Sequence, residues 1–486
     1  MLYNSMDILF LTTEFQGVVK TGGLADVAKA LPKELTLMGH NIKVVLPLYA
    51  SAKNTDNLEL VGEYDLTVRD HPPMHYRVFK RLYNDIFVWF IDYPHYFDRN
   101  SLYDENSVAY SDNGERFTFF TICAMEICIH QNFRPYIVHC NDWHTAIAPF
   151  LLKTRYSETP VFENTRSVIT VHNGSFQGVF DRAQLWLVPE IYEHYNEFIM
   201  QGMSYINLLK CGVFYADEIN TVSPGYAQEL TTYLGGHGMA KNYSSRADHL
   251  RGIVNGCDYT DWDPITDTLI PFNYSADHLE SKNLCKHILQ RKLGLDINDF
   301  PLFGMICRLT EQKGLNILLP VLEKFLVHKL NLIIIGTGDV GFSLQLKDIA
   351  SRHTDKMVFI NSYDEILAHM TEAAADFFLM PSLYEPCGLN QMYSMSYGTL
   401  PIVRAVGGLK DTVIDYDHDR NHASGFVFEL PDPIDFLSTL RRALLFYLQE
   451  TDEYKRVQIN AMHTRYYWYQ SATQYVKMYE DAHKPR

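Results

Sequence analysis

Short runs of consecutive apolar residues alternate along the chain with longer stretches in which apolar residues recur every three or four positions. In the first half, the apolar runs predict strands at residues 8–12, 42–46, 86–91, 137–140 and 167–171. The amphipathic stretches between them predict helices at residues 24–38, 117–130 and 145–154. Strands that are apolar at nearly every position are typical of parallel sheets that helices cover on both faces.

The second half repeats this alternation. Its apolar runs predict strands at residues 302–307, 330–335, 357–360, 377–380 and 401–403, with helices at residues 314–325 and 364–374 among others. Two such sets in one chain predict an α/β protein with two doubly wound, Rossmann-like domains that face a cleft. Ligands of these sheets bind beyond the carboxyl ends of the strands, so we look for chemistry in the segments that follow strands.

The break between the two sets falls in a stretch rich in Asn, Gly, Asp, Trp and Pro at residues 251–271. We therefore predict a first domain at residues 1–250 and a second domain at residues 251–463. The C-terminal helix, at residues 464–486, is expected to pack back on the first domain.

Charge and cysteine content narrow the possible partners. The 486 residues carry 42 Lys and Arg against 58 Asp and Glu, a formal net charge of −16. Nucleic acids and anionic membranes need a basic face, so we predict neither as a partner. A small anionic ligand stays compatible wherever local cations outweigh the overall charge. No apolar stretch approaches the roughly 20 residues that span a bilayer, and the first residues do not resemble a signal peptide. The 8 cysteines form no C-x-x-C pairs. We therefore predict a cytoplasmic protein.

Three motifs of the first half follow predicted strands. Lys20-Thr21-Gly22-Gly23 precedes a helix, where paired glycines admit a ligand close to the backbone and a helix start attracts phosphate. Asp142 and His172 follow two later strands, where such groups can hold sugar hydroxyls or steady a transient charge. Each also has a structural explanation: a plain turn, a helix N-cap and a packed histidine. Their convergence on one sheet edge favours a ligand site.

In the second half, Arg308 and Lys313 stand on either side of a turn that leads into a helix, and can grip a diphosphate from two directions. A solvated basic pair explains them as well. Glu385 follows another predicted strand and precedes a glycine-containing helix start at residues 387–389. This arrangement places a carboxylate, which accepts hydrogen bonds from sugar hydroxyls, beside backbone N–H donors.

Two other patterns have weaker support. Residues 336–341 match G-x-G-x-x-G, but a dinucleotide site needs an acidic residue near the end of the next strand, and none comes before Asp364. Asp415, Asp417 and Asp419 contain the D-x-D pattern with which some sugar transferases hold a cation. Their polar surroundings favour a solvated loop.

Taken in order, the motifs resemble those of the bacterial glycogen synthase and plant starch synthase family over essentially the whole chain. The resemblance rests on K-T-G-G-L at 20–24, H-N-x-x-x-Q-G at 172–178, T-V-S-P at 221–224, N-G-x-D at 255–258, R-L-T-E-Q-K-G at 308–314, G-T-G-D at 336–339, E-P-C-G-L at 385–389 and Y-G-T-L-P-I-V-R at 397–404. It implies a two-domain GT-B glycosyltransferase. Such an enzyme transfers glucose from ADP-glucose to the non-reducing end of an α-1,4-glucan with retention of configuration.

The resemblance also implies roles for individual residues. The catalytic group is Asp142, His172, Arg308, Lys313 and Glu385. The donor-binding group is Lys20, Gly22, Gly23, Asn173, Gly338, Asp339, Tyr363, Cys387, Gly388, Leu389 and Thr399. The implied partners are ADP-glucose and glycogen or another α-1,4-glucan, and neither a cofactor nor a metal is implied. Whether the chain forms a homo-oligomer stays open.

The sequence departs from the family pattern at Leu383, Asn390 and Tyr393, and residues 14–17 lack the usual proline. The choice between ADP-glucose and UDP-glucose therefore stays open. A glucan phosphorylase with pyridoxal phosphate and a glucan-binding protein with an inactive transferase fold are the alternatives. The inactive protein is disfavoured, because every charged residue of the predicted site is present.

Overall fold

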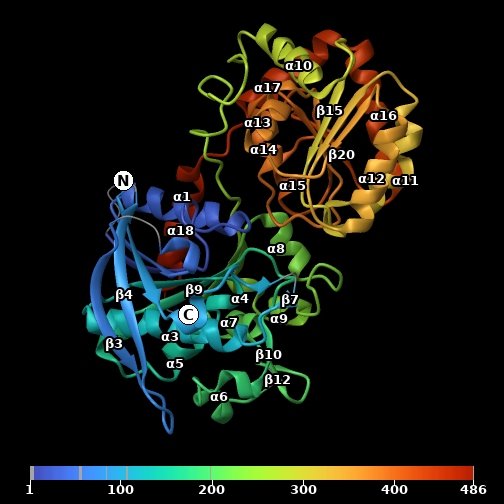
Figure 1. Ribbon diagram of the computed structural model, residues 1–486. Coiled ribbons are helices and arrows are strands. Elements are labelled where there is room, and N and C mark those ends of the chain that lie inside the picture. Colours follow the sequence, from blue (N-terminus) through green and yellow to red (C-terminus); the bar gives the residue numbers. More distant parts are fainter. Residues whose placement is uncertain (1–4, 54–56, 84, 106–107, 197–198, 485–486) are drawn as a thin grey trace. The chain divides into compact units, whose positions relative to one another are not determined.

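The structure of the protein, a computed structural model, describes residues 5–53, 57–83, 85–105, 108–196 and 199–484. The chain divides into two compact units (Figure 1). Unit 1 comprises Met1–Val222, Ala227–Asn255 and Trp468–Arg486, and unit 2 comprises Ser223–Tyr226 and Gly256–Tyr467. The sequence placed the corresponding boundaries at 250/251 and 463/464. None of the described helices is both long enough and apolar enough to cross a membrane.

Unit 1 is built around a sheet that has nine strands within the described residues. From β14 to β5 neighbouring strands are parallel, and β4 and β3 then continue the sheet in antiparallel fashion. In sheet order the strands are β14 (Leu250–Gly252), β13 (Glu218–Thr221), β9 (Arg166–Val171), β8 (Ile137–Asn141), β1 (Asp7–Leu11), β2 (Asn41–Pro47), β5 (Ile86–Asp92), β4 (Met74–Tyr83) and β3 (Glu59–Leu66).

The hairpin of β3 and β4 was not predicted from the sequence. Along β4 buried and exposed residues alternate, with Tyr76 and Val78 buried and His75 and Arg77 exposed. This period of two marks a strand that is covered on one face only. A search for continuous apolar runs therefore finds the central strands and misses this edge.

Five helices of unit 1 pack on its sheet or on one another. They are α1 (Gly23–Leu37), α3 (Asn113–His130), α5 (Ala148–Lys153), α7 (Leu208–Tyr215) and α18 (Trp468–Asp481). The helix predicted at residues 145–154 is found over Ala148–Lys153 only, because α4 (Asp142–Thr145) ends before it as a separate helix. Pro149 lacks the N–H that a continuous helix would bond to the Thr145 carbonyl.

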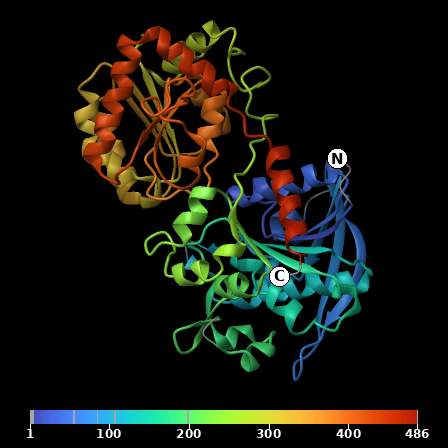
Figure 2. The ribbon, with the colours of Figure 1, turned by 180° about the vertical axis from the view of Figure 1, so that it is seen from behind.

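The C-terminal helix α18 packs against α1 in unit 1, and both views show the two helices side by side (Figures 1 and 2). Two buried tyrosines fix its register: the Tyr479 hydroxyl bonds Nδ1 of His139 at 2.7 Å, and the Tyr475 hydroxyl accepts from the Asn220 amide at 2.8 Å. The last helix thus supplies hydrogen-bond partners to the central strands of unit 1.

Shorter elements complete unit 1. They are η1 (Ala50–Ala52), α2 (Pro94–Phe97), β6 (Asp104–Glu105), β7 (Val108–Ala109), η2 (Pro160–Phe162), β10 (Val179–Asp181), η3 (Arg182–Leu185), α6 (Glu190–Glu193), β11 (Met200–Gln201), β12 (Tyr205–Asn207), α9 (Ala240–Ser244) and η4 (Ala247–His249). Helix α8 (Pro224–Leu230) begins in the short segment that belongs to unit 2.

Unit 2 has a parallel sheet of six strands within the described residues. In sheet order they are β17 (Met357–Ile360), β16 (Asn331–Ile335), β15 (Leu302–Ile306), β18 (Phe377–Met380), β19 (Leu400–Arg404) and β20 (Phe426–Phe428). Phe303 and Met305 pack into one hydrophobic core, whereas their neighbour Leu302 packs into a second core. Both faces of the sheet are therefore buried, which explains the continuous apolar runs.

Helices cover both faces of this sheet. Figure 1 shows α11, α12 and α16 on one side and α13 on the other. The helices of unit 2 are α10 (Glu280–Leu293), α11 (Leu315–Leu326), α12 (Val340–Arg352), α13 (Glu365–Ala374), α14 (Asn390–Ser396), α15 (Gly407–Thr412), α16 (Pro433–Gln449) and α17 (Thr451–His463). The predicted fold class, two α/β domains built on parallel sheets, is confirmed.

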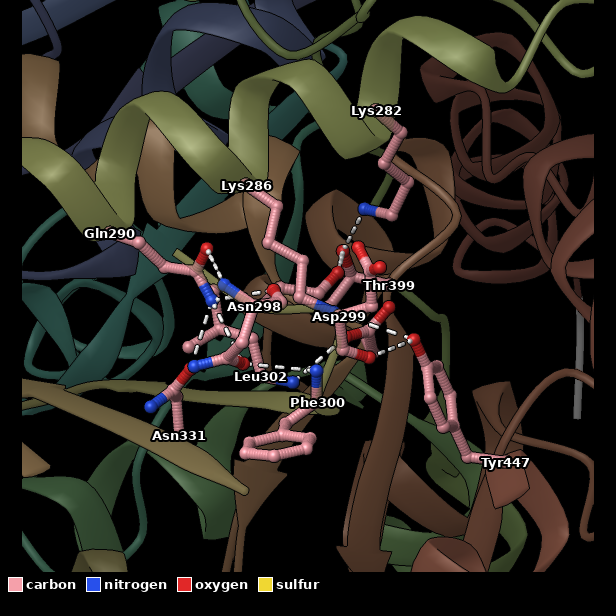
Figure 3. Close-up of polar contacts among 12 residues, drawn as sticks. Lys282, Lys286, Gln290, Asn298, Asp299, Phe300, Leu302, Asn331, Thr399 and Tyr447 are labelled. Carbon is pink, nitrogen blue, oxygen red and sulfur yellow. Dashed lines mark hydrogen bonds and ion pairs between the residues drawn. The ribbon is translucent and has the colours of Figure 1, made fainter. Parts of the chain in front are cut away.

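A buried ion pair joins α10 to the sheet of unit 2. Lys286 Nζ lies 2.7 Å from Oδ2 of Asp376, the residue before β18, and both side chains are almost fully buried. The same oxygen accepts the Leu302 N–H at 2.8 Å, and Tyr454 donates to the other oxygen at 3.2 Å. Figure 3 shows Lys282 and Lys286 extending from α10 into this polar cluster. The cluster ties α10 to β15 and β18.

We expect Lys286→Met to destabilise unit 2 by about 3 kcal/mol, because the methionine fills the space of the lysine but leaves the Asp376 carboxylate buried without its cation. Differential scanning calorimetry of the full chain measures the loss. Lys292→Met, on the exposed end of the same helix, is the control and should change the free energy of unfolding by less than about 0.5 kcal/mol. Equal effects of the two substitutions would contradict the role of the pair.

Candidate active site

Unit 2 contains a cavity of about 200 Å³ at the carboxyl ends of β15 and β18. Its polar lining comes from Arg308, Lys313, Ser382, Glu385 and Asn390, and its apolar wall from the two strands. Gly388 and Leu389, two predicted donor-binding residues, line it as well. The structure thus brings together three predicted catalytic residues that lie up to 77 positions apart in the sequence.

Glu385 is the buried centre of this cavity. Its Oε2 lies 2.6 Å from Lys313 Nζ and accepts the Ser382 hydroxyl at 3.1 Å. The carboxylate is 9% exposed and the lysine 21%, so the pair is screened from bulk water on most sides. A carboxylate held in this way keeps a fixed direction.

Arg308 differs from its neighbours because it is exposed and makes no side-chain hydrogen bond or ion pair with any residue that the structure describes. It follows the end of β15, at the mouth of the cavity that Lys313 and Glu385 line. A guanidinium with unused donors beside a partly buried lysine favours an anion with several oxygens, such as a phosphate or diphosphate.

The Glu385 loop is fixed by backbone contacts from three directions. Arg404 Nε donates to the Ser382 carbonyl at 2.8 Å, and its guanidinium also bonds the Leu383 carbonyl. Gly408 N–H donates to the Glu385 carbonyl at 3.1 Å. A side chain at Gly407 would collide with that same carbonyl, which explains why this position carries glycine.

Lys313 is positioned by the glycine that follows it. The short helix η5 (Glu311–Lys313) ends at Gly314, whose φ of +75° is left-handed, and α11 begins there. A Cβ at Gly314 would overlap the Pro381 carbonyl oxygen. The glycine after Lys313 therefore lets this turn approach the Glu385 loop closely.

Asp142 stands at the carboxyl end of β8 in unit 1. Its φ of +54° is unusual for a residue other than glycine. Its Oδ1 accepts the backbone N–H groups of His172 at 2.7 Å and Asn173 at 3.4 Å. Burial raises the pKa of Asp142 to about 7, although the two backbone donors lower it. The side chain thus ties two strand ends together rather than capping a helix.

His172 is neutral at physiological pH, because burial lowers its pKa to about 3. Its Nε2 lies 2.8 Å from the Asn141 side-chain oxygen, so Nε2 carries the proton and Nδ1 keeps its lone pair. The Asn173 side chain turns the other way, toward the N–H and hydroxyl of Ser175 at 3.1 and 2.7 Å. His172 can therefore accept or donate a hydrogen bond but does not supply a proton near pH 7.

The turn at residues 20–23 is held by Glu14, a residue that the sequence reasoning did not select. The buried carboxylate accepts the Thr21 N–H at 2.6 Å, the Thr21 hydroxyl at 2.6 Å and the Gly22 N–H at 3.0 Å. The Tyr103 hydroxyl also donates to it at 2.9 Å. Neither Glu14 nor Tyr103 stands in one of the motifs selected from the sequence, and their partners become visible only in the fold.

The same turn leaves its glycines open. A Cβ added to Gly22 or Gly23 meets no atom within 4 Å among the described residues, and neither glycine has a left-handed φ. The packing of the protein therefore does not require glycine there, which fits close approach of a ligand to the backbone. Lys20 is half-exposed and pairs with Asp26 at 2.6 Å.

Gly338 and Asp339 have structural explanations. Gly338, with a φ of +151°, lies against the backbone of Leu309, and Asp339 caps α12 by accepting the Phe342 N–H at 2.9 Å. Tyr363 follows β17 with a 65% exposed side chain. The Cys387 side chain is buried, and its carbonyl accepts from Gln391 at 3.0 Å.

The assignment of Thr399 to donor binding is corrected by the structure. Its side chain is fully buried, and its hydroxyl donates toward the carbonyls of Glu372 and Ala375 at 2.6 and 2.8 Å. The same hydroxyl accepts from Lys282 at 2.8 Å, as Figure 3 shows. Thr399 therefore links β19 to α10 and α13 inside unit 2, away from the cavity.

The carboxylates of Asp415 and Asp417, in the D-x-D pattern, are both paired with one arginine. Arg442 donates to both carboxylate oxygens of Asp415, at 3.1 and 2.7 Å, and also bonds Asp417. Asp419 instead pairs with His422 at 2.9 Å. Among the residues described, no three His, Cys, Asp or Glu side chains are placed to hold a metal ion together.

Comparison with known proteins identifies relatives over the whole chain. Residues 7–244 match the family model described as the starch synthase catalytic domain, and residues 290–464 match that of glycosyl transferases group 1. The chain is 53% identical to a glycogen synthase of Aeromonas salmonicida, with 99% of each chain covered. It is 47% identical to a glycogen synthase of Vibrio vulnificus, with all of both chains covered.

Solved structures agree with these relatives. The catalytic domain of starch synthase IV from Arabidopsis thaliana, bound to ADP and acarbose, matches with a TM-score of 0.90 and 30% identity, covering 99% of this chain and 100% of that one. Sucrose-phosphate synthase from Thermosynechococcus elongatus matches with a TM-score of 0.60 at 15% identity, which shows a shared fold.

The buried Asp142 carboxyl makes a prediction about stability. Its pKa is about 7 in the folded chain, against 3.8 for an unperturbed Asp side chain, so the folded state binds the proton more tightly. Folding stability therefore falls as the pH rises from about 4 to about 7. Asp142→Asn removes this cost and keeps a residue type that tolerates positive φ. We expect a melting temperature about 3 °C or more above wild type at pH 8, and a smaller gain at pH 5.5.

Asp70→Asn is the matched control, since Asp70 also has a positive φ, of 63°, but is fully exposed. It should shift the melting temperature equally at both pH values. A gain for Asp142→Asn that does not depend on pH would show that burial of the charge is not its cause.

Proposed function

The chain belongs to the glycogen and starch synthase family of glycosyltransferases, and from this premise we propose how its residues carry out glucosyl transfer. The protein is a glucosyltransferase that extends an α-1,4-glucan. We propose ADP-glucose as its donor. The observation that carries the proposal is the unit 2 cavity, in which the Arg308 side chain has no partner among the described residues and Lys313 contacts the buried Glu385.

Arg308 and Lys313 bind the donor diphosphate in this proposal. When the bond to the anomeric carbon breaks, negative charge grows on the departing diphosphate and positive charge on the glucose. The guanidinium N–H groups of Arg308 bond none of the described residues, so all of them can bind the diphosphate. Lys313 is held in place by Glu385. Lys313 is thus fixed before the reaction, so its part in stabilising the leaving group needs little rearrangement.

Glu385 serves the glucose in this proposal. Its Oε2 is occupied by Lys313 and Ser382, which orients the carboxylate inside the cavity. Carboxylate oxygens accept hydrogen bonds from sugar hydroxyls, and a fixed negative charge favours the positive anomeric centre. The N–H groups of the backbone at residues 387–389 would add donors for the phosphates.

We assign the transferred glucose to Asp142 and His172 in unit 1. His172 is neutral and can accept a hydrogen bond from a sugar hydroxyl at Nδ1. Because it is not protonated, it does not act as a second proton donor to the diphosphate. Asp142 titrates near neutral pH and supplies negative charge in its ionised form. We propose that Lys20 and the open backbone of Gly22 and Gly23 approach the donor, with Glu14 positioning their turn.

Tyr363 offers an exposed ring for the nucleotide base, and Gly338 and Asp339 contribute through their backbone, because the Asp339 carboxylate already caps α12. We propose that the reaction needs neither a cofactor nor a metal, since Arg308 and Lys313 supply the positive charge that a cation supplies elsewhere. The 8 free cysteines, seven of them buried, are consistent with a reducing cytoplasm.

Removing the charged groups of the cavity should abolish turnover without unfolding the chain. Lys313→Ala and Glu385→Gln are each expected to lower kcat about 100- to 1000-fold, or about 3–4 kcal/mol. Arg308→Ala should also raise the KM for the donor, because its guanidinium binds the ground-state diphosphate. Lys324→Ala, an exposed lysine on α11, is the control and should keep wild-type kinetics. Near-normal kcat for Lys313→Ala or Glu385→Gln, with unchanged circular dichroism, would contradict these assignments.

The proposed function is tested by nucleotide release from ADP-glucose and from UDP-glucose, each with and without glycogen, after dialysis against EDTA. We expect glycogen-dependent release of ADP that added Mg²⁺ does not increase. Faster release from UDP-glucose would contradict the proposed donor, and activity that returns only with Mg²⁺ would contradict the metal-free reaction. Release from neither donor would defeat the function itself.

A further inference from the structure

The T-V-S-P motif at residues 221–224 supplies none of the groups assigned to the donor or the glucose. Its Ser223 and Pro224 lie in the short segment Ser223–Tyr226, which belongs to unit 2 although the chain enters it from β13 of unit 1. Ser223 is fully buried. A buried hydroxyl needs hydrogen-bond partners, so its contacts show what holds this segment in place.

Ser223 bonds the backbone of the Glu385 loop. Its hydroxyl donates to the Pro386 carbonyl at 2.6 Å and accepts the Tyr226 N–H at 3.1 Å. Pro386 directly follows Glu385 and has no backbone N–H, so its carbonyl is the backbone group through which a hydrogen bond can hold it. Ser223 therefore fixes the chain one residue after the carboxylate that lines the cavity.

Asp411 holds the same segment by its backbone. Asp411 Oδ2 accepts the Gly225 N–H at 2.6 Å, and Asp411 lies on α15. A Cβ at Gly225 would lie 2.7 Å from the Gly407 carbonyl oxygen, closer than Cβ atoms come to other atoms in proteins. Because this oxygen belongs to the backbone, it cannot turn away as the end of a flexible side chain can. The segment is therefore packed directly against the start of α15.

The start of α15 also contacts the Glu385 loop. Gly408 donates its N–H to the Glu385 carbonyl at 3.1 Å and to the Pro386 carbonyl at 3.2 Å. The Pro386 carbonyl thus has two donors, Ser223 and Gly408, which matches the two lone pairs of a carbonyl oxygen. Three segments therefore pack together inside unit 2: residues 223–226, 385–387 and 407–411.

We propose that Ser223 is a positioning residue for glucosyl transfer, which holds the Pro386 carbonyl and thereby directs Glu385 into the cavity. Lys313 and Ser382 hold the oxygen end of the Glu385 side chain, whereas Ser223 holds the backbone beside it. A group that is displaced by about 1 Å from its productive position loses a large part of its effect on the rate. The role of Glu385, and with it this proposal, rests on the proposed function.

Capping of α8 is the alternative role, because Ser223 also accepts the Tyr226 N–H. A cap contributes to stability alone, whereas a positioning residue acts on turnover through Glu385. A double-mutant cycle separates the two roles by combining Ser223→Ala with Glu385→Gln. Asp411→Ala disturbs the same segment from its other side, and Asp411→Asn keeps an acceptor oxygen for the Gly225 N–H.

Thr165→Val is the matched control. The Thr165 hydroxyl is buried and donates to the Pro135 carbonyl, also at 2.6 Å, but it lies before β9, at the opposite end of that strand from His172. For each variant kcat, the KM for ADP-glucose in the presence of glycogen, and the melting temperature are measured. Hydrogen exchange followed by mass spectrometry reports on peptides that cover residues 383–389 and needs no turnover.

We expect Ser223→Ala and Asp411→Ala to lower kcat about tenfold in the wild-type background but less than about twofold in the Glu385→Gln background, and to speed exchange at residues 383–389. Asp411→Asn and Thr165→Val should stay within about twofold of the wild-type kcat. An equal loss of kcat in both backgrounds, or a lower melting temperature with normal kcat and exchange, would overturn the proposal. If the wild type transfers no glucose, the proposed function fails, and the exchange measurements alone decide whether Ser223 holds the loop.

Discussion

A carboxylate that is buried away from water must be paired with a cation or with hydrogen-bond donors, and this constraint fixes several loops of the protein. Glu385 is held by Lys313 and Ser382, Glu14 by the turn at residues 21–22, and Asp376 by Lys286. Each of these acids stands at or near the end of a strand, and each joins segments that are far apart in the sequence. The parallel strands place these carboxylates near strand ends. The loops around them are fixed because each buried carboxylate needs a cation or hydrogen-bond donors.

The two units use this constraint in different ways. In unit 2 an acid is paired with a cation and a second cation is left available, which suits the binding of an anion. In unit 1 the donors to Asp142 among the described residues are backbone N–H groups, and burial raises its pKa to about 7. His172 beside it is kept neutral. The unit 2 cavity thus has a cation available for an anion, while the unit 1 group pairs a neutral histidine with an aspartate that titrates near neutral pH.

The sequence predicted the features that follow from local pattern. Continuous apolar runs located the central strands of both sheets, and residues after those runs, such as Arg308, Lys313 and Glu385, meet in one cavity. Features that depend on tertiary partners were out of reach. The hairpin of β3 and β4 is exposed on one face, so a search for continuous apolar runs does not find it. The role of Glu14 is visible only in the backbone N–H groups that donate hydrogen bonds to it. Thr399 was misplaced because a motif does not show which way a side chain points.

The return of α18 to unit 1 has a consequence for biosynthesis. Tyr475 and Tyr479 provide hydrogen-bond partners for Asn220 and His139 within the sheet of unit 1, yet they are synthesised only after the whole of unit 2. A nascent chain that has not yet reached α18 therefore carries an unfinished first unit with polar groups uncovered. Synthesis of unit 2 thus has to precede the completion of unit 1, although unit 1 begins first along the chain.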